Sequence, residues 1–207
     1  MSKKSLSARS KASVWHPFTQ MKIAEGPIGI VRGDGSYLYT EEGDKFIDGI
    51  SSWWTCIHGH SHPYITEKLS AQARNLEHVM FAGFTHEPAV QLAENLLSAL
   101  PQNQAKIFYS DNGSTAVEVG LKMAFQYWKN LKKVKTKIIA FNDSYHGDTF
   151  GAMSVGSRSA FTEAFFPFLF DVEFVESPAR NADLCLAQIK ALVAQGDVAA
   201  IVYEPLV

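Results

Sequence analysis

Residues 106–151 read KIFYSDNGSTAVEVGLKMAFQYWKNLKKVKTKIIAFNDSYHGDTFG, and this stretch decides the fold. Its first five residues are an apolar, aromatic run with the length of a buried strand. A helix is predicted from Ala116, because apolar residues recur at helical spacing as far as Trp128. A second apolar run follows at 138–141. A strand, a tight turn, a helix and a second strand form a βαβ unit, and its first turn lies where such units bind ligands.

The turn at residues 111–115 has the composition of an anion site. The N-terminus of a helix offers free backbone N–H groups and the positive end of the helix dipole. Gly113 lets a ligand approach the backbone closely, and Ser114 adds a hydroxyl. Thr115 and Glu118 match a capping box, which predicts that the helix starts after Thr115 and leaves the earlier amides free. A plain helix cap without a ligand is the alternative, since one Gly-Ser pair is a weak signal.

Composition describes an ordinary globular chain. Its 207 residues suit one domain or one and a half, and 46% of them are hydrophobic against 19% charged. A net charge of -2 gives no electrostatic case for binding nucleic acid or an anionic membrane. The cysteines, Cys56 and Cys185, form no ligand motif and are expected to be small buried side chains in a reducing compartment, the cytoplasm.

Three regions are expected along the chain. Residues 1–13 are basic, serine-rich and free of acids, which predicts a disordered tail. Residues 14–62 form an N-terminal segment with a β-meander, whose strands are predicted at 28–32, 37–40 and 46–48. Residues 63–207 read as an α/β domain. The apolar run 165–170 is short and contains Pro167, so no membrane span is expected.

The region after residue 62 alternates helices with apolar strands. Helices are predicted from Pro63 to about residue 76, from Pro88 to residue 100, and around residues 184–192. Further strands are predicted at 172–175 and 198–203. This alternation is typical of a mainly parallel, doubly wound sheet.

Two clusters before residue 63 have more than one interpretation. Trp53 and Trp54 lie in a predicted strand or loop, where one indole would pack inward and the other would meet a ligand. Three histidines at positions 58, 60 and 62 would share one face of an extended chain, as metal ligands do. They form no ligand motif with an acid or a cysteine, and a helix starts at Pro63. A turn with helix-capping histidines is therefore the alternative to a metal site.

Several motifs together resemble a known family. They are Trp15-His16-Pro17-Phe18-Thr19, Asp48-Gly49-Ile50-Ser51-Ser52-Trp53-Trp54, Gly113-Ser114, the run from Tyr145-His146-Gly147 to Ser154, and Glu204-Pro205. With them the chain resembles, over residues 14–207, the class III aminotransferases that use pyridoxal 5'-phosphate. Within that class it is most similar to the enzymes of biotin synthesis.

The resemblance implies roles for five residues. Gly113 and Ser114 would hold the cofactor phosphate, which agrees with the helix-terminus argument. Tyr145 would lie against the pyridine ring and help to form the substrate site. Trp53 would line the substrate pocket, with Phe18 beside it. Phe18 stands where the best-known members have a tyrosine, so it keeps the packing and loses a hydroxyl.

The implied reaction is amino-group transfer to 8-amino-7-oxononanoate, giving 7,8-diaminononanoate. S-adenosylmethionine is the implied amino donor, with lysine used by some relatives, and the implied assembly is a homodimer. The Schiff-base lysine of the family is expected beyond Val207, because Lys106, Lys122 and Lys137 match no such motif. The acid that pairs with the pyridine nitrogen and the arginine for the substrate carboxylate are also absent. The chain thus resembles the N-terminal half of the enzyme, with no catalytic residue of its own.

The family's fold-type I architecture implies an incomplete sheet. We expect the strand at 138–141 to pair with both 172–175 and 198–203, and the strand at 106–110 to pair with neither. Unpaired strand edges would make the isolated half-chain aggregation-prone.

Other functions remain open from the residues alone. The βαβ unit could bind a dinucleotide, with Asp143 on a ribose, but its turn has one glycine where that fingerprint has three. A class III aminotransferase for another amine or amino acid, or a truncated homologue that acts only by pairing with another chain, is also compatible with the fold.

Overall fold

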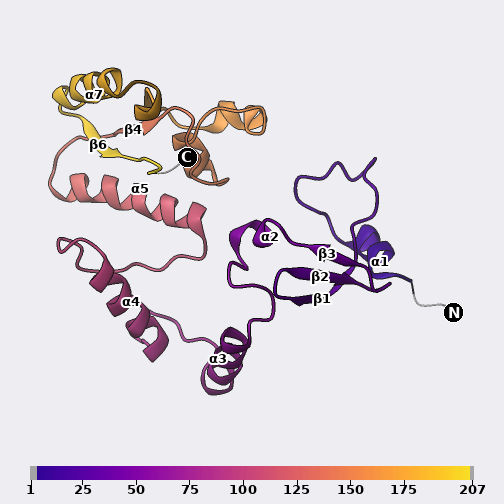
Figure 1. Ribbon diagram of the computed structural model, residues 1–207. Coiled ribbons are helices and arrows are strands. Elements are labelled where there is room, and N and C mark those ends of the chain that lie inside the picture. Colours follow the sequence, from indigo (N-terminus) through magenta and orange to yellow (C-terminus); the bar gives the residue numbers. More distant parts are fainter. Residues whose placement is uncertain (1–3, 206–207) are drawn as a thin grey trace. The chain divides into compact units, whose positions relative to one another are not determined.

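The computed structural model describes residues 4–205 and divides the chain into two compact units, residues 1–91 and 92–207 (Figure 1). The division falls inside helix α4 (Glu87–Ala99). The sequence-based boundary after residue 62 therefore lies within the first unit.

The first unit contains the predicted β-meander. Strands β1 (Ile30–Asp34), β2 (Tyr37–Thr40) and β3 (Lys45–Ile47) form an antiparallel sheet in the order β1-β2-β3. The turn between β2 and β3 is closed by the buried Thr40, whose Oγ1 accepts hydrogen bonds from the N–H groups of Glu42 and Asp44. The predicted meander is confirmed, with strand ends shifted by one or two residues.

A helix occupies most of the stretch expected to be a disordered tail. Helix α1 (Leu6–Ser13) begins at Ser5, whose Oγ accepts a hydrogen bond from the N–H of Ala8. The N–H of Leu6 donates to Glu41 at 2.6 Å, and the Nζ of Lys11 donates to the carbonyl of Ala24 at 3.0 Å. Local capping and these two tethers explain the order, which composition alone does not reveal. Residues 1–3 of the predicted tail lie outside the described residues.

The helices predicted after the histidine cluster are present. Helix α3 spans Pro63–Asn75, with proline at its first turn, and α4 spans Glu87–Ala99. Between β3 and α3 lies a four-residue turn, α2 (Ser51–Trp54), in place of the predicted strand or loop. All four of its residues have positive φ, from 48° to 64°. The prediction that the two indoles point to opposite faces, as neighbouring side chains of a strand do, is therefore wrong.

The second unit is built on a parallel sheet. Its elements are α5 (Gly113–Asn130), β4 (Lys137–Phe141), α6 (Phe150–Val155), a 3-10 helix (Glu163–Phe168), β5 (Glu173–Val175), α7 (Pro178–Ala194) and β6 (Val198–Ile201). The strand order is β5-β4-β6, and both pairings are parallel. The central place of β4 between β5 and β6 confirms the predicted topology.

Residues 106–110 differ from the prediction in one respect. Within the described part of the chain they belong to neither sheet and are not a strand. The expectation that they pair with neither β5 nor β6 is confirmed, while the strand itself is wrong for this chain. A strand is defined by its backbone pairing with a neighbouring strand, so apolar composition alone does not make one.

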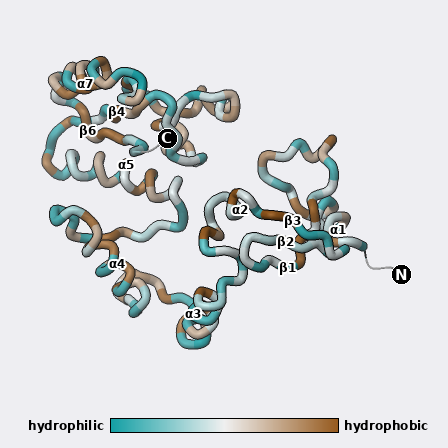
Figure 2. The backbone as a smooth tube through the Cα atoms, in the orientation of Figure 1, coloured by the Kyte–Doolittle hydropathy of each residue, from teal (hydrophilic) through white to brown (hydrophobic). Residues whose placement is uncertain are grey.

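The core lies on both faces of this sheet. Ile138 and Ala140 of β4 pack with Leu121 of α5 and Val155 of α6. Ile139 faces the other way and packs with three residues, Val175, Val198 and Cys185. This alternation is the period-two pattern of a strand buried on both sides. Figure 2 shows β4 and β6 as hydrophobic backbone segments.

Both cysteines have free thiols. Cys185 is buried in this core, as expected, while Cys56 is half-buried. Among residues 4–205, no helix combines the length and the apolar character needed to cross a membrane.

Candidate functional site

The N-terminus of α5 starts earlier than the sequence predicts. Asn112 is the N-cap: it has extended backbone angles, and its Oδ1 accepts a hydrogen bond from the N–H of Thr115 at 3.0 Å. Thr115 returns a bond, since its Oγ1 accepts from the N–H of Asn112 at 3.1 Å. The capping box is therefore Asn112 with Thr115, and the predicted box of Thr115 with Glu118 is wrong. Glu118 instead accepts from the N–H of Gly151 at 2.7 Å, which ties α5 to α6.

This cap leaves two amides available at the helix end. Thr115 N–H is bonded to the cap, and Ala116 N–H to the carbonyl of Asn112. In the described part of the chain, the N–H groups of Gly113 and Ser114 have no hydrogen-bond partner. A Cβ on Gly113 would meet no described atom within 4 Å, so the approach to this end is open. Two free amides and the positive end of the helix dipole lie at this helix end, and these are groups that bind anions in other proteins.

The loop after β4 packs against this helix end. The N–H of Asp148 donates to Ser114 Oγ at 3.1 Å, which leaves the hydroxyl proton of Ser114 free to donate elsewhere. Gly147 has a φ of 126°, and a Cβ at this position would overlap the side chain of Ser114. The loop and the helix end therefore fit together only with glycine at position 147.

Tyr145 is held by contacts at both its backbone and its hydroxyl. Its N–H donates to the carboxylate of Glu204 at 3.0 Å, and its hydroxyl donates to Asp148 Oδ2 at 2.9 Å. Burial, with a smaller contribution from the Asp148 carboxylate, raises the pKa of the Tyr145 phenol above its ordinary value. The residue is nonetheless 63% exposed, so much of its surface is open to a ligand. Asp148, to which sequence reasoning assigned only a loop position, joins Tyr145 to Ser114.

Two buried polar atoms of the same loop lack partners among the described residues. They are Nε2 of His146 and Oγ1 of Thr149, the N-cap residue of α6. Burial lowers the pKa of His146, and the Glu204 carboxylate partly offsets that shift. A neutral imidazole and a hydroxyl without partners are groups that a polar ligand could satisfy.

In the first unit, two of the predicted substrate residues are neighbours. The rings of Phe18 and Trp53 lie edge to face, with centroids 5.5 Å apart. Both side chains are largely exposed, and both residues have positive φ. Trp54 is exposed as well and makes no aromatic ring contact within residues 4–205. Of the two indoles, Trp53 is therefore the one that packs against another aromatic ring.

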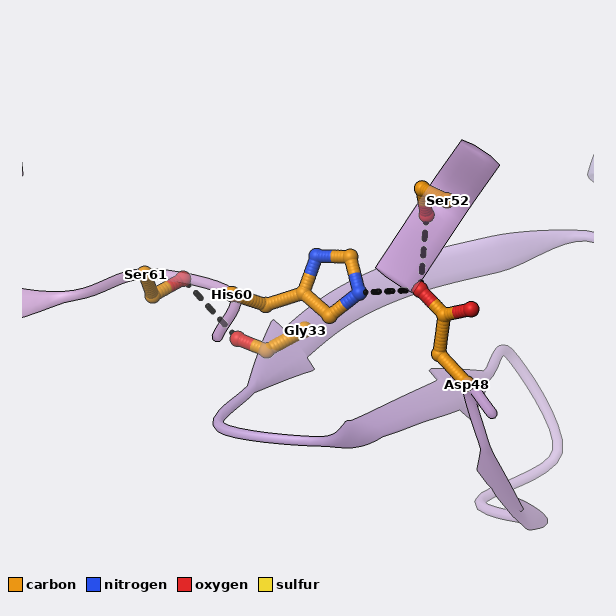
Figure 3. Close-up of polar contacts among 5 residues, drawn as sticks. All are labelled: Gly33, Asp48, Ser52, His60 and Ser61. Atoms are coloured by element: carbon orange, nitrogen blue, oxygen red, sulfur yellow. Dashed lines mark hydrogen bonds and ion pairs between the residues drawn. The ribbon is translucent and has the colours of Figure 1, made fainter. Parts of the chain in front are cut away.

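The histidine cluster has a structural arrangement. His60 Nε2 lies 2.8 Å from Asp48 Oδ2 (Figure 3), and the rings of His58 and His62 meet edge to face at 6.2 Å. His62 occupies the N-cap of α3, but its side chain makes no capping hydrogen bond. The prediction that a histidine side chain caps this helix is therefore wrong. Among the described residues, no group of three or more potential ligands could hold a metal ion.

Asp48 is expected to titrate at unusually low pH. Hydrogen bonds from the backbone and hydroxyl of Ser52, and then from His60, lower the pKa of its carboxyl from 3.8 to about 2. A pKa that is lower in the folded than in the unfolded state stabilises the fold above about pH 4. That contribution is lost as the pH falls through about 2. Following the Asp48 carboxyl carbon by NMR should show this low midpoint, and Ser52→Ala should raise it. A midpoint near 4 in the parent protein would contradict the contacts.

Comparison with known proteins places the chain in a family. The family model of aminotransferase class-III matches residues 20–207. An adenosylmethionine-8-amino-7-oxononanoate aminotransferase of Synechococcus elongatus is 50% identical, over 96% of this chain and 49% of its own length. The Geobacter sulfurreducens protein of the same name is 43% identical, over 94% of this chain and 47% of its own length.

Solved structures agree with this placement. The crystal structure of adenosylmethionine-8-amino-7-oxononanoate aminotransferase from Methanocaldococcus jannaschii is 36% identical, with a TM-score of 0.86 over 95% of this chain and 45% of that one. An omega transaminase from Pseudomonas jessenii in complex with PMP is 26% identical, with a TM-score of 0.88 over 98% of this chain and 49% of that one. The chain spans about half the length of these relatives. On its family match, and with the fold-type I sheet topology that its neighbours share, the chain belongs to the class III aminotransferases.

Proposed function

We propose that the complete protein transfers an amino group to 8-amino-7-oxononanoate, giving 7,8-diaminononanoate in biotin synthesis. The names of the most similar relatives support this acceptor, and they also support S-adenosylmethionine as the amino donor. The proposed cofactor is pyridoxal 5'-phosphate, in keeping with the PMP complex of a structural relative.

The observation that carries the proposal is the pair of free amides at Gly113 and Ser114. A phosphate group fits there because the helix end supplies two N–H donors, a hydroxyl proton and a favourable dipole. The partnerless atoms of His146 and Thr149, on the loop that packs against this end, are further polar groups that suit a bound ligand. The cofactor supplies an electron sink for amino-group transfer, and this chain supplies its orientation.

Tyr145 is the residue that we propose to orient the cofactor ring. Its phenol is fixed by Asp148 and its backbone by Glu204, so the aromatic plane has little freedom to turn. A flat side chain held at both ends suits stacking against a flat heterocycle. Asp148 then connects ring and phosphate recognition, because it contacts both Tyr145 and Ser114.

Trp53 and Phe18 are the residues that we propose to contact the acceptor. The acceptor carries a long aliphatic chain, and the two aromatic rings, with planes 66° apart, offer it an exposed apolar surface against which it can pack. Phe18 contributes no hydroxyl, so this part of the surface recognises shape and apolar character.

We also propose a cytoplasmic homodimer. The free thiols of Cys56 and Cys185 suit a reducing compartment, and the homodimer follows from the class III resemblance. Sedimentation of the complete protein checks the dimer.

The acceptor proposal is tested by steady-state kinetics on the complete enzyme. With pyridoxal 5'-phosphate and S-adenosylmethionine supplied, we expect kcat/KM for 8-amino-7-oxononanoate to exceed that for shorter keto acids. A preference for shorter keto acids would replace the biotin assignment with another class III aminotransferase. Activity with lysine in place of S-adenosylmethionine would change the donor alone.

Replacing Ser114 with alanine should weaken cofactor binding. The variant loses one hydrogen bond to a charged phosphate, which costs on the order of 1–3 kcal/mol, while both backbone amides remain. Titration of the apoenzyme with pyridoxal 5'-phosphate measures the change. Ser98→Ala is the matched control, because within residues 4–205 the hydroxyl of Ser98 bonds only to the Asn95 carbonyl of its own helix. Equal cofactor affinities in the parent and Ser114→Ala would exclude this role.

A further inference from the structure

The loop that carries the two indoles is joined at its ends by a pair of side chains. Asp48 follows strand β3 and precedes the left-handed turn α2, whereas His60 lies at the end of the loop, just before α3. Their side chains meet across the mouth of the loop at 2.8 Å (Figure 3). The segment 49–59, which includes Trp53, is thereby closed into a ring by a contact between residues twelve apart.

Asp48 holds both the loop end and the turn. Its Oδ2 accepts one hydrogen bond from Ser52 Oγ at 2.7 Å and another from His60 Nε2 at 2.8 Å. An ionised carboxylate only accepts hydrogen bonds, so the proton of His60 in this contact lies on Nε2. The two side chains are 6% and 15% exposed, which shields the pair from water and strengthens the contact.

His60 is in turn fixed to the β-meander. Its backbone forms an isolated antiparallel bridge with Gly35, with N–H to carbonyl bonds of 2.8 and 3.1 Å. The hydroxyl of Ser61 donates to the Gly33 carbonyl at 2.9 Å. A Cβ on Gly33 would lie 2.7 Å from the Cβ of His60, so glycine there is what allows the imidazole to lie against β1. The sheet therefore provides a rigid base for the imidazole.

The turn that presents Trp53 needs such a base. Ser51, Ser52, Trp53 and Trp54 are four consecutive non-glycine residues in left-handed backbone conformation, which sterics disfavour for each of them. A run of this kind persists only where its surroundings determine it. Asp48 links the turn to the sheet. Its carboxylate accepts one hydrogen bond from Ser52 of the turn and another from His60, which is bonded to the sheet.

We propose that Asp48 and His60 are positioning residues for the acceptor site: together they hold the left-handed turn so that Trp53 stays against Phe18. For its effect on the acceptor, this inference rests on the proposed function. Neither residue is proposed to contact substrate. When the contact between Asp48 and His60 is lost, the turn is no longer held in place. The Trp53 indole then moves away from Phe18, and the gap between the two rings widens.

The position of Trp53 can be followed directly by fluorine NMR. The complete cofactor-loaded enzyme is labelled with 5-fluorotryptophan, and the Trp53 resonance is assigned from its loss in Trp53→Phe. We expect Asp48→Asn and His60→Ala to shift or broaden that resonance. His60→Gln should restore it, because the glutamine amide places a donor near the position of Nε2. Asp34→Asn is the matched control, an aspartate of the same meander whose ion pair with Arg32 is exposed.

Kinetics then separate positioning from general damage. Asp48→Asn and His60→Ala should raise KM for 8-amino-7-oxononanoate at least about fivefold and leave the affinity for pyridoxal 5'-phosphate within about twofold, with His60→Gln near the parent. A structural role alone would weaken both affinities or neither. Ser52→Ala, which removes one bond and keeps the charge, should change the resonance in the same direction by less. If Asp48→Asn does not fold, Ser52→Ala and His60→Ala together test the proposal.

The two levels of the proposal fail in different ways. An unchanged Trp53 resonance in folded His60→Ala enzyme overturns the positioning role, whatever the acceptor is. A parent enzyme that does not aminate 8-amino-7-oxononanoate overturns the proposed function, and the resonance of Trp53 still decides whether the pair holds the turn.

Discussion

Truncation of Trp53 to alanine in the complete enzyme is expected to lower kcat/KM for 8-amino-7-oxononanoate roughly 30- to 160-fold. This corresponds to about 2–3 kcal/mol, the range for removing a tryptophan that anchors an apolar contact. Alanine retains a Cβ, so it bears the same backbone cost as tryptophan in the left-handed turn. The loss should therefore fall on the acceptor and hardly on the stability of the fold. Steady-state kinetics with varied acceptor, beside a thermal unfolding curve, make the comparison.

Trp54→Ala is the control for that experiment. It removes the same side chain from the next residue of the same turn, where the structure shows no aromatic ring contact within residues 4–205. A change of less than about threefold, or about 0.7 kcal/mol, is expected there. Equal losses in the two variants, or no loss in Trp53→Ala, would contradict the assignment of Trp53 to the acceptor surface.

Replacement of Gly147 with alanine is expected to weaken cofactor binding by at least an order of magnitude. The added Cβ would overlap Ser114, and the φ of 126° is one that alanine rarely adopts. Backbone strain of this kind costs about 1–3 kcal/mol, and the loop can relieve it only by moving away from the end of α5. That movement would break the bond from Asp148 to Ser114 and turn Tyr145 away. Titration with pyridoxal 5'-phosphate measures the effect.

Gly196→Ala separates strain from overlap in the same unit. Gly196 also has a positive φ, of 82°, but a Cβ there would meet no described atom within 4 Å. We expect a modest loss of stability and an unchanged cofactor affinity. If Gly147→Ala binds the cofactor as the parent does, the loop does not depend on close packing against α5.

Elements that depend on local pattern were predictable from the sequence. The meander, α3, α4, α5 and β4 follow from hydrophobic periodicity and turn residues. The sequence wrongly predicts a strand at 106–110, because its apolar run has the composition of a strand, yet among residues 4–205 the run belongs to neither sheet. The left-handed turn at 51–54 carries no sequence signal, since it contains none of the glycines that usually accompany positive φ.

The candidate site shows the same division. Gly113 and Ser114 follow from the rule that helix N-termini bind anions, although the cap itself is Asn112 and not Thr115. Asp48 with His60, and Tyr145 with Glu204, are joined over 12 and 59 residues of chain. A side chain that bonds across such distances leaves no periodic mark in the sequence. These pairings can be identified only once the fold has brought together the loops that carry them.

The most direct test of this account is a crystal structure of the complete enzyme with pyridoxal 5'-phosphate bound. We expect the phosphate to lie within hydrogen-bond distance of the N–H groups of Gly113 and Ser114 and of the Ser114 hydroxyl, with the ring against Tyr145. A phosphate bound away from the N-terminus of α5, with those two amides bonded only to water, would contradict it.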